Sequence, residues 1–456
     1  MEKLRIRPIL AAMAVAVACM GLASCGYWGM VTRYEPVLRS MEDVRASLTV
    51  APEPPVFTVE GLGKITLSAD RRFLFVNDVN RGVRVADLAV PAVPEWVGYI
   101  DVPGTVDLAY LELGGTEYLY VDSFVDLVIL ELDLPRTDAT FGAVEVGRVL
   151  DAFPGDPYQW FWDDDSPVWF AEAIPADQVV VGYTTRTSLE WIETSFLPVY
   201  AMDGAGSGTA GASGSMARFA LHEDADHALW YLYAVDSYEL RTFSLADPST
   251  PNEEPSMNAG WSIETIFPYR DLLFLGSTSA LYIYDVSNSP DSSPKSPVKR
   301  ATLNHFAGRD PVVVGPVGTS GSELDTAFVT ISEDRWGWGD NVLIAVDVSD
   351  PTAPLDIVRR NMYGPRGLGL LGNTLFVCEG DHGFVAVDVT HVRDGATLDE
   401  RLAVKQYARP ASETYDVIPG DAYQIVVGTD GITLYDYDEG TGALTTIGEL
   451  AAGAAD

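Results

Sequence analysis

The sequence predicts an all-β fold, a seven-bladed β-propeller built from four-stranded blades. A short strand of alternating pattern recurs along the chain and ends on an acidic or small polar residue. These ends are Asp87, Glu131, Ser244, Asp285, Asp347, Asp388 and Asp436. Most successive ends lie 41–48 residues apart, which is the length of one propeller blade. Frequent Gly and Pro separate the strands, and no long amphipathic helical pattern interrupts them.

The composition is that of a globular chain with enough apolar residues for a large core. Of its 456 residues, 47% are hydrophobic and 21% are charged, which excludes wholesale disorder. Asp and Glu number 66 against 29 Lys and Arg, so the net charge is −37. Because a field of this sign repels phosphate backbones, we expect no nucleic-acid partner. A solvated surface explains the acidity, with cations or basic partners as the alternative.

The N-terminus carries the pattern of a signal peptide. A basic segment precedes an apolar stretch over 9–22, which is shorter than the roughly 20 residues that span a bilayer. The stretch ends in Leu22-Ala23-Ser24-Cys25, which resembles the lipobox of bacterial lipoproteins. That resemblance implies cleavage before Cys25 and attachment of lipid to this residue. Because Gly26 follows, it also implies sorting to the outer membrane, on the periplasmic or cell-surface side. A plain signal peptide with a chance Cys is the alternative.

The sequence divides into a leader, an arm, the repeats and a tail. We expect a lipoprotein signal peptide over 1–24, a lipidated tether and N-terminal arm over 25–57, the propeller over 58–450 and a C-terminal tail over 451–456.

Two intervals between repeats exceed one blade. The interval after the second repeat holds an insertion over 151–214, with an aromatic and acidic run at 160–165, an expected strand at 179–183 and a Gly-rich linker at 204–211. The aromatic run is either a lid packed on the propeller or a platform for a sugar or peptide. We attribute the other long interval, before Asp347, to long loops in blade five.

The repeats resemble the LVIVD repeat, a β-propeller repeat of bacterial and archaeal cell-surface proteins. The matching stretches are 63–65 with 73–77, 120–127, 214–219, 264–268, 310–314 and 415–419. The chain as a whole is similar to LVIVD-repeat lipoproteins, a largely uncharacterised group. The resemblance covers nearly all of the mature chain and implies the propeller fold, whereas it implies no established activity.

The first residue of each innermost strand is charged. These seven positions, here called the mouth ring, are Lys64, Asp107, Arg218, Glu264, Asp310, Arg366 and Asp416. In a propeller the inner strands converge on a central channel, so these charges are expected at its mouth. They form either a structural ring of ion pairs or a site for a polar ligand or cation.

Loops between the second and third strands should open on the same face. We expect their polar and aromatic residues to form a rim around the mouth: Asp122, Asp126, Trp336, Trp338, Asp381 and His382. The Trp residues either anchor their loop or stack on a ligand.

No motif names a reaction. The sequence lacks a P-loop, an H-E-x-x-H helix and a G-x-S-x-G elbow. Cys378 lies four residues before His382, but a nucleophilic dyad needs spatial pairing, and a buried Cys at a strand end is the simpler interpretation. We expect no cofactor and assign no catalytic residue. The metal question stays open, since carboxylate-rich loops suit Ca²⁺ but lack EF-hand spacing.

These observations favour a non-enzymatic function. We expect an envelope-anchored lipoprotein that binds or assembles with an envelope protein or glycan through the charged, Trp-rimmed face of the propeller. Two alternatives remain at this stage, an envelope hydrolase or lyase that uses carboxylates at the mouth, and a purely structural lipoprotein. Fold analogy cannot choose among them.

Overall fold

The computed structural model divides into two compact units, described here separately. One comprises 1–40 with 157–207, and the other comprises 41–156 with 208–456. The residues that the structure describes are 27–52, 62–136, 140–153, 160–163, 166–169, 174–175, 177–192, 217–289, 291–304, 311–332, 340–410 and 412–452.

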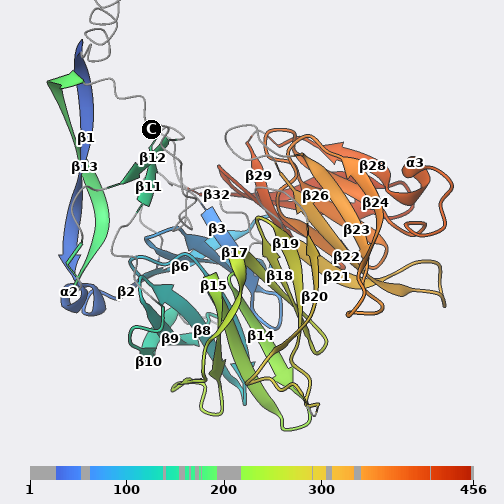
Figure 1. The fold of residues 1–456 in the computed structure, drawn as a ribbon, viewed down its shortest axis with the longest axis horizontal. Helices are drawn as coiled ribbons and strands as arrows, with labels where there is room; N and C mark the ends of the chain where they lie inside the picture. The colour runs from blue at the N-terminus through green and yellow to red at the C-terminus, as the bar shows by residue number, and fades with distance from the viewer. Residues whose placement is uncertain are drawn as a thin grey trace, which may run out of the picture. The chain divides into compact units, whose positions relative to one another are not determined.

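The larger unit contains the repeats, and they form a seven-bladed propeller, as predicted. Figure 1 shows the blades following one another in chain order, from blue to red. Blades one and two comprise β3 (Leu62–Leu67), β4 (Phe73–Asp78), β5 (Gly82–Asp87), β6 (Glu95–Asp101), β7 (Leu108–Leu113), β8 (Thr116–Ser123), β9 (Asp126–Asp133) and β10 (Gly142–Val149). Blades three and four comprise β14 (Phe219–Asp224), β15 (Leu229–Ser244), β16 (Asn252–Glu253), β17 (Met257–Tyr269), β18 (Leu272–Ser277), β19 (Ala280–Asp285) and β20 (Val298–Asn304).

The last three blades are regular four-stranded antiparallel sheets. They comprise β21 (Val312–Val317), β22 (Leu324–Ile331), β23 (Val342–Asp347), β24 (Leu355–Asn361), β25 (Leu368–Leu371), β26 (Thr374–Cys378), β27 (Phe384–Asp388), β28 (Ala403–Ala408), β29 (Thr414–Ile418), β30 (Gln424–Gly428), β31 (Gly431–Asp438) and β32 (Ala443–Ala451). A short helix, α3 (Leu398–Arg401), precedes β28.

Blade three contains the long strand β15, and the long strand β17 continues from blade three into blade four. β15 folds back on itself, as a hydrogen bond between its two ends shows: the Leu245 amide donates to the Trp230 carbonyl at 2.9 Å. In blade one the Leu88 amide donates to the Arg72 carbonyl in the same way, joining the end of the third strand to the start of the second. The two arms of β15 are therefore the second and third strands of blade three. β17 begins at the outer edge of blade three and continues as the inner strand of blade four.

The core lies between the blades, because side chains alternate across each strand. In β4, Phe73 and Phe75 pack against blade two, whereas Leu74 and Val76 pack against blade seven. The described core forms seven clusters of this kind, one for each interface between neighbouring blades. This explains why second strands such as β18, β26 and β30 are nearly uniformly apolar. In six blades the pairing between the third and the outer strand contains a register shift, which marks a β-bulge. Bulges of this kind increase the twist of the sheet.

The recurring Asp at the end of the third strand has a structural role. In blades one, four, five and six its carboxylate accepts the backbone N–H two residues later, at 2.8–3.0 Å. A basic side chain pairs with the same carboxylate in all four blades. The Asp thus closes the turn at the end of the strand, which explains the repeat that the sequence displays.

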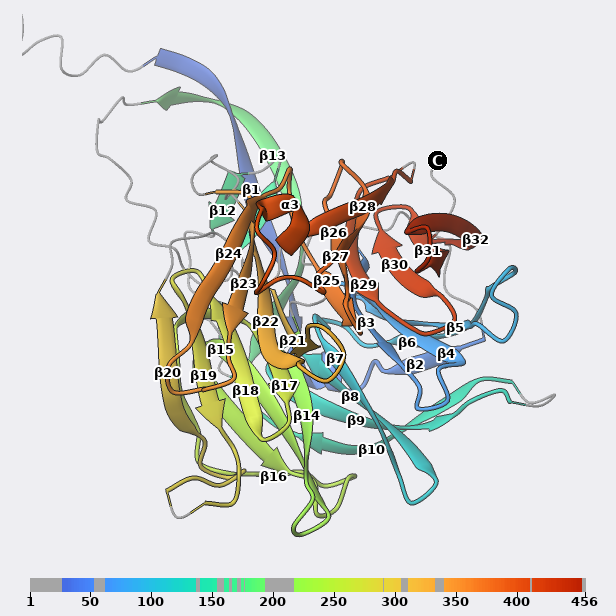
Figure 2. The same ribbon diagram turned by 90° about the vertical axis from the view of Figure 1, so that its right-hand side faces the viewer.

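The ring closes between blade seven and blade one, whose strands lie side by side in Figure 2. The Arg84 guanidinium, buried in blade one, donates to the Ala452 carbonyl at 2.6 Å, and the Trp96 indole donates to the Ala451 carbonyl at 2.8 Å. No strand is exchanged across this interface among the described residues. Side-chain packing and these hydrogen bonds close the ring.

The segment expected as an N-terminal arm contributes to the propeller unit. β2 (Thr49–Ala51) adds a fifth strand to the outer edge of blade one, and α2 (Met41–Arg45) precedes it. The long interval before Asp347 is shared between blade four, where residues 286–297 connect β19 to β20, and the loop between β22 and β23 of blade five. Our attribution to blade five was therefore incomplete.

The smaller unit is built from two antiparallel pairs of strands. β1 (Tyr27–Ser40) pairs with β13 (Gln178–Ile192), and β11 (Trp160–Asp163) pairs with β12 (Ser166–Trp169). The insertion therefore pairs with the N-terminal arm, and the expected strand at 179–183 lies within β13. Within the described parts of the chain, no helix has the length and apolar character needed to cross a membrane.

Candidate functional site

The upper face is the face that carries the connections between blades and the turns between second and third strands. These turns include 79–81, 124–125, 236–238, 278–279, 379–383 and 429–430. Six members of the mouth ring lie within or directly before the inner strands that begin on this face: Lys64, Asp107, Arg218, Glu264, Arg366 and Asp416. Asp310 lies outside the described residues. The strand order thus places these six residues near the starts of inner strands on the upper face.

Asp107 joins three blades. Its buried carboxylate pairs with Lys64 of blade one at 2.9 Å and accepts the amide of Phe219 in blade three at 3.2 Å. It also accepts the Arg218 amide. Lys64 reaches blade three as well, donating to the Phe219 carbonyl at 3.0 Å. These contacts give this part of the mouth ring a structural role.

Asp122 lies directly behind Asp107. One of its oxygens accepts the amides of Val106 and Asp107 at 2.7 and 2.9 Å. Burial of the side chain raises the pKa of Asp122 to about 6, although the charge of Arg218 opposes the shift. A carboxyl group with this pKa exchanges its proton near neutrality. It is, however, only 6% exposed.

Two arginines of the mouth ring form ion pairs with carboxylates that do not belong to the ring. Arg218 lies 3.8 Å from Asp236 in the turn of blade three. Arg366 pairs with Glu413 at 2.9 Å and lies over the Tyr415 ring, 4.8 Å from its centroid. Both of these pairs are partly exposed. Arg218 and Arg366 therefore pair with carboxylates that do not belong to the mouth ring.

The rim residues have different surroundings. Asp126 is buried and accepts Arg45 of α2 through two hydrogen bonds of 2.7 and 2.8 Å, together with Arg148 at 3.2 Å. It therefore attaches α2 to blade two. Asp381 and His382 are exposed in the turn of blade six. Trp336 and Trp338 lie outside the described residues.

Within the part of the chain that the structure describes, Trp261 and Tyr363 are large aromatic side chains exposed on the upper face. Trp261 is 56% exposed and meets the Tyr238 ring edge to face, with centroids 5.1 Å apart. Tyr363 is 63% exposed and meets the His382 ring in the same way at 4.8 Å. The sequence analysis did not single out Trp261 or Tyr363.

A positional signal for these residues does exist in the sequence. Trp261 lies three residues before Glu264, and Tyr363 lies three residues before Arg366. Both aromatic residues therefore occupy the same position relative to the mouth ring. Alignment of the connections between blades, and not only of the strands, would have identified them.

The possible nucleophile is inaccessible. Cys378 is fully buried at the end of β26, and this burial raises the pKa of its thiol. The His382 ring instead packs on Tyr363. Among the described residues, no three His, Cys, Asp or Glu side chains gather as a metal site requires.

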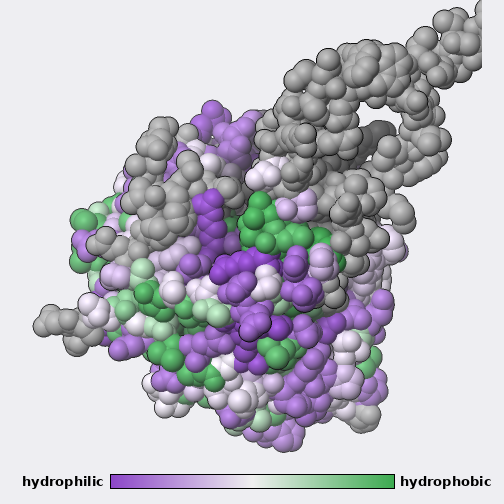
Figure 3. Space-filling model, turned by 90° about the vertical axis from the view of Figure 1, so that its left-hand side faces the viewer, coloured by the Kyte–Doolittle hydropathy of each residue, from purple (hydrophilic) through white to green (hydrophobic). Residues whose placement is uncertain are grey.

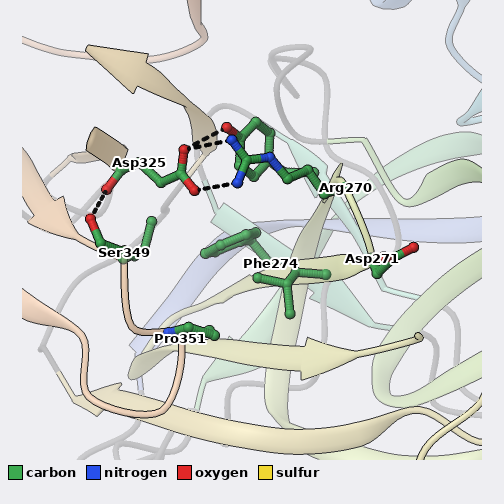
Figure 4. A pocket seen from close by; sticks show the side chains of 9 residues that line it. Arg270, Asp271, Phe274, Asp325, Ser349 and Pro351 are labelled. Atoms are coloured by element: carbon green, nitrogen blue, oxygen red, sulfur yellow. Dashed lines mark hydrogen bonds and ion pairs between the residues drawn. The ribbon is translucent and has the colours of Figure 1, made fainter. Parts of the chain in front are cut away.

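Two surface pockets lie away from the mouth ring. A pocket of about 220 Å³ lies on the lower face, opposite the upper face, between blades four and five. In Figure 4, Arg270 closes one side of it through two hydrogen bonds of 2.7 and 3.0 Å to Asp325. The other pocket, of about 530 Å³, borders Glu131 and Phe141 of blade two. Neither is lined by a mouth-ring residue.

The face drawn in Figure 3 is largely polar. On the side drawn in Figure 3, small hydrophobic patches lie among hydrophilic residues. This distribution agrees with the acidic composition, and it makes individual exposed aromatic residues more informative than a broad apolar area.

Comparison with known proteins identifies the fold. No family model and no curated protein matches the chain. Among solved structures, a protein from Lactobacillus plantarum matches with a TM-score of 0.51 and 13% identity, covering 85% of this chain and 94% of that one. The periplasmic gluconolactonase of Pseudomonas aeruginosa matches with a TM-score of 0.50 and 9% identity, covering 86% and 95%. At these identities the similarity shows a seven-bladed β-propeller and nothing further about function.

Proposed function

We propose that the chain is a lipoprotein of the outer membrane that acts as a non-enzymatic binding module through its upper face. The lipobox-like sequence that ends at Cys25 and the resemblance to LVIVD-repeat lipoproteins support the anchor and the location. The mouth ring and its aromatic neighbours support the binding face. The partner is an envelope protein or glycan.

The exposed aromatic pairs carry this proposal. Large aromatic side chains contribute strongly to binding surfaces because they bury much area with few rotatable bonds. Trp261 and Tyr363 lie on one face of the propeller, and each is held edge to face by a second ring. Each exposed ring leaves apolar surface in contact with water, and a ligand that covers this surface would gain the free energy of its burial.

The charges beside these rings suit a polar partner. Arg218 with Asp236 and Arg366 with Glu413 are partly exposed pairs on the same face as the two aromatic positions. They offer hydrogen-bond donors and acceptors to a ligand at little cost, because partly exposed pairs contribute little to stability. The overall charge of −37 disfavours polyanionic partners.

The test compares matched variants of a soluble form that lacks residues 1–25 and so comprises residues 26–456. Purified peptidoglycan, outer-membrane vesicles and surface polysaccharide are each sedimented with the protein. We expect the parent to bind one fraction and Trp261→Ala/Tyr363→Ala to bind it at least about tenfold more weakly. Val93→Ala/Leu355→Ala, which removes two equally exposed side chains from the lower face, should bind as the parent does.

Two results would count against the proposal. Equal binding by the two double variants would place the binding surface elsewhere. Absence of binding by the parent to all fractions would favour a structural lipoprotein.

The enzymatic alternative depends on Asp122. Its pKa of about 6 is suited to general acid or base chemistry. Its burial and its bonds to the Val106 and Asp107 amides favour a structural role. Turnover of an envelope glycan that is lost in Asp122→Asn while binding persists would establish the alternative.

A further inference from the structure

Blade six holds an exposed tyrosine in a fixed position. Tyr363 lies in the connection between β24 and β25. Its backbone N–H donates to Glu379 at 3.1 Å. Its ring meets the rings of His382 at 4.8 Å and Tyr407 at 6.3 Å, both edge to face. The exposed face of Tyr363 is therefore presented by a preorganised support, which reduces the entropy lost on binding.

The Glu379 carboxylate, which accepts the Tyr363 N–H, is buried at a cost in free energy. Glu379 is 1% exposed, and its burial raises the pKa of the carboxyl group. Its partners in this site are the Tyr363 N–H and the Tyr407 hydroxyl, which donates at 3.4 Å. Burying a carboxyl group is unfavourable unless hydrogen bonds compensate. Here the compensation fixes an exposed aromatic residue, which a purely structural loop does not need.

Polar groups lie at the turn that carries His382 and at the end of the connection that carries Tyr363. The Arg366 guanidinium pairs with Glu413 and stacks on Tyr415. Gly380, two residues before His382, has a φ of +54°, and a Cβ there would lie 3.0 Å from two guanidinium nitrogens of Arg366. A larger residue at this position would therefore push the guanidinium away. The glycine keeps it against the turn that carries His382.

The combination is suited to a sugar. A pyranose ring presents apolar C–H groups on one face and hydroxyl groups around its edge. Tyr363 offers an aromatic surface for the first, while Arg366 and Glu413 offer fixed donors and acceptors for the second. Because Arg366 and Glu413 neutralise each other and Asp381 is exposed nearby, the local charge disfavours anionic sugars.

We propose that the upper face of blade six is a saccharide-binding subsite in which a neutral pyranose ring stacks on Tyr363 and its hydroxyl groups bond to Arg366 and Glu413. This rests on the proposed function and names its ligand class. Glu379 is a positioning residue, because it acts through the Tyr363 loop.

The test titrates residues 26–456 with oligomers of glucose, mannose and N-acetylglucosamine, and with galacturonic acid oligomers as the anionic comparison. We expect one neutral oligomer to bind, Tyr363→Ala to weaken it by at least about tenfold, and Tyr363→Trp to retain it. Glu379→Leu should weaken binding and Glu379→Gln should preserve it, because the amide oxygen still accepts the Tyr363 N–H. Melting curves identify any variant that fails to fold. If Tyr363→Ala or Glu379→Leu does so, the predicted retention of binding by Tyr363→Trp and Glu379→Gln still tests the proposal.

The results that would contradict the saccharide subsite differ from those that would contradict the proposed function. Equal affinity of the parent and Tyr363→Ala, stronger binding of the anionic oligomers, or no neutral binding would overturn the subsite. If an envelope fraction binds the parent and this binding is lost in Trp261→Ala but not in Tyr363→Ala, the proposed function stands and the subsite is wrong.

Discussion

Lys64 and Asp107 form a salt bridge of 2.9 Å that ties blade one to blade two at the mouth of the channel. The same carboxylate accepts the Phe219 amide of blade three. Part of the mouth ring is therefore a structural junction, and the candidate binding residues are the partly exposed charges and aromatic rings beside it.

The junction predicts a strong effect of Asp107→Leu. The substitution removes the charge partner of Lys64 and the acceptor of buried amides, so it should lower the free energy of unfolding by roughly 3–5 kcal/mol. Urea denaturation measures this. Asp381→Ala, in an exposed turn, should stay within about 0.5 kcal/mol of the parent. A loss below about 1 kcal/mol for Asp107→Leu would show that the junction is dispensable.

Asp122 predicts a pH-dependent stability difference. Because burial raises its pKa to about 6 in the folded protein, its favourable contribution is present below the unfolded pKa of about 4 and is lost as pH rises through 6. Asp122→Asn removes this titration. Its stability relative to the parent should therefore improve by roughly 2 kcal/mol between pH 4.5 and pH 8, at about 1.4 kcal/mol per pH unit. A constant difference across this range would refute the assignment.

Ring closure predicts a large effect of Arg84→Met. The guanidinium is buried, pairs with the buried Asp78 at 2.9 Å and bonds to Ala452 of the last blade. Its removal should cost roughly 3–5 kcal/mol in chemical denaturation. Arg359→Met breaks an exposed pair with Asp356 and should cost less than about 1 kcal/mol. Similar losses in the two variants would mean that closure depends on packing alone.

The predicted anchor is tested by labelling. The full chain, expressed in a Gram-negative host, should incorporate radioactive palmitate and sediment with membranes. Cys25→Ser should lose the label, since its hydroxyl replaces the thiol that the lipid needs. Cys19→Ser, within the expected signal peptide, should keep it. Retention of label by Cys25→Ser would disprove lipidation at this residue.

The repeated architecture could be predicted because its determinants are local. In blades one, four, five and six the third strand ends on an Asp that closes the following turn, as Asp87 and Asp347 do by accepting the amides of Ala89 and Ser349. Burial by itself would raise the pKa of Asp347, but hydrogen bonds from Arg393 and Ser349 outweigh it and lower the pKa to about 2. A local turn of this kind leaves a regular trace in the sequence.

Features that depend on distant segments could not be predicted in the same way. β1 pairs with β13 across about 150 residues, and nothing in either strand specifies its partner. The support of Tyr363 by Glu379 likewise depends on which loops meet on blade six. Alternation and turn residues predict strands, whereas the exposure of a loop residue depends on the packing around it.

The most direct test of the binding face is hydroxyl-radical footprinting of the protein in isolated envelopes and as purified residues 26–456. Trp261 and Tyr363 should be oxidised more slowly in envelopes, because the partner covers them. Val93 and Leu355, equally exposed on the lower face, should react alike in both preparations. Equal oxidation of Trp261 and Tyr363 in the two preparations, or protection of Val93 and Leu355 instead, would contradict binding through the upper face.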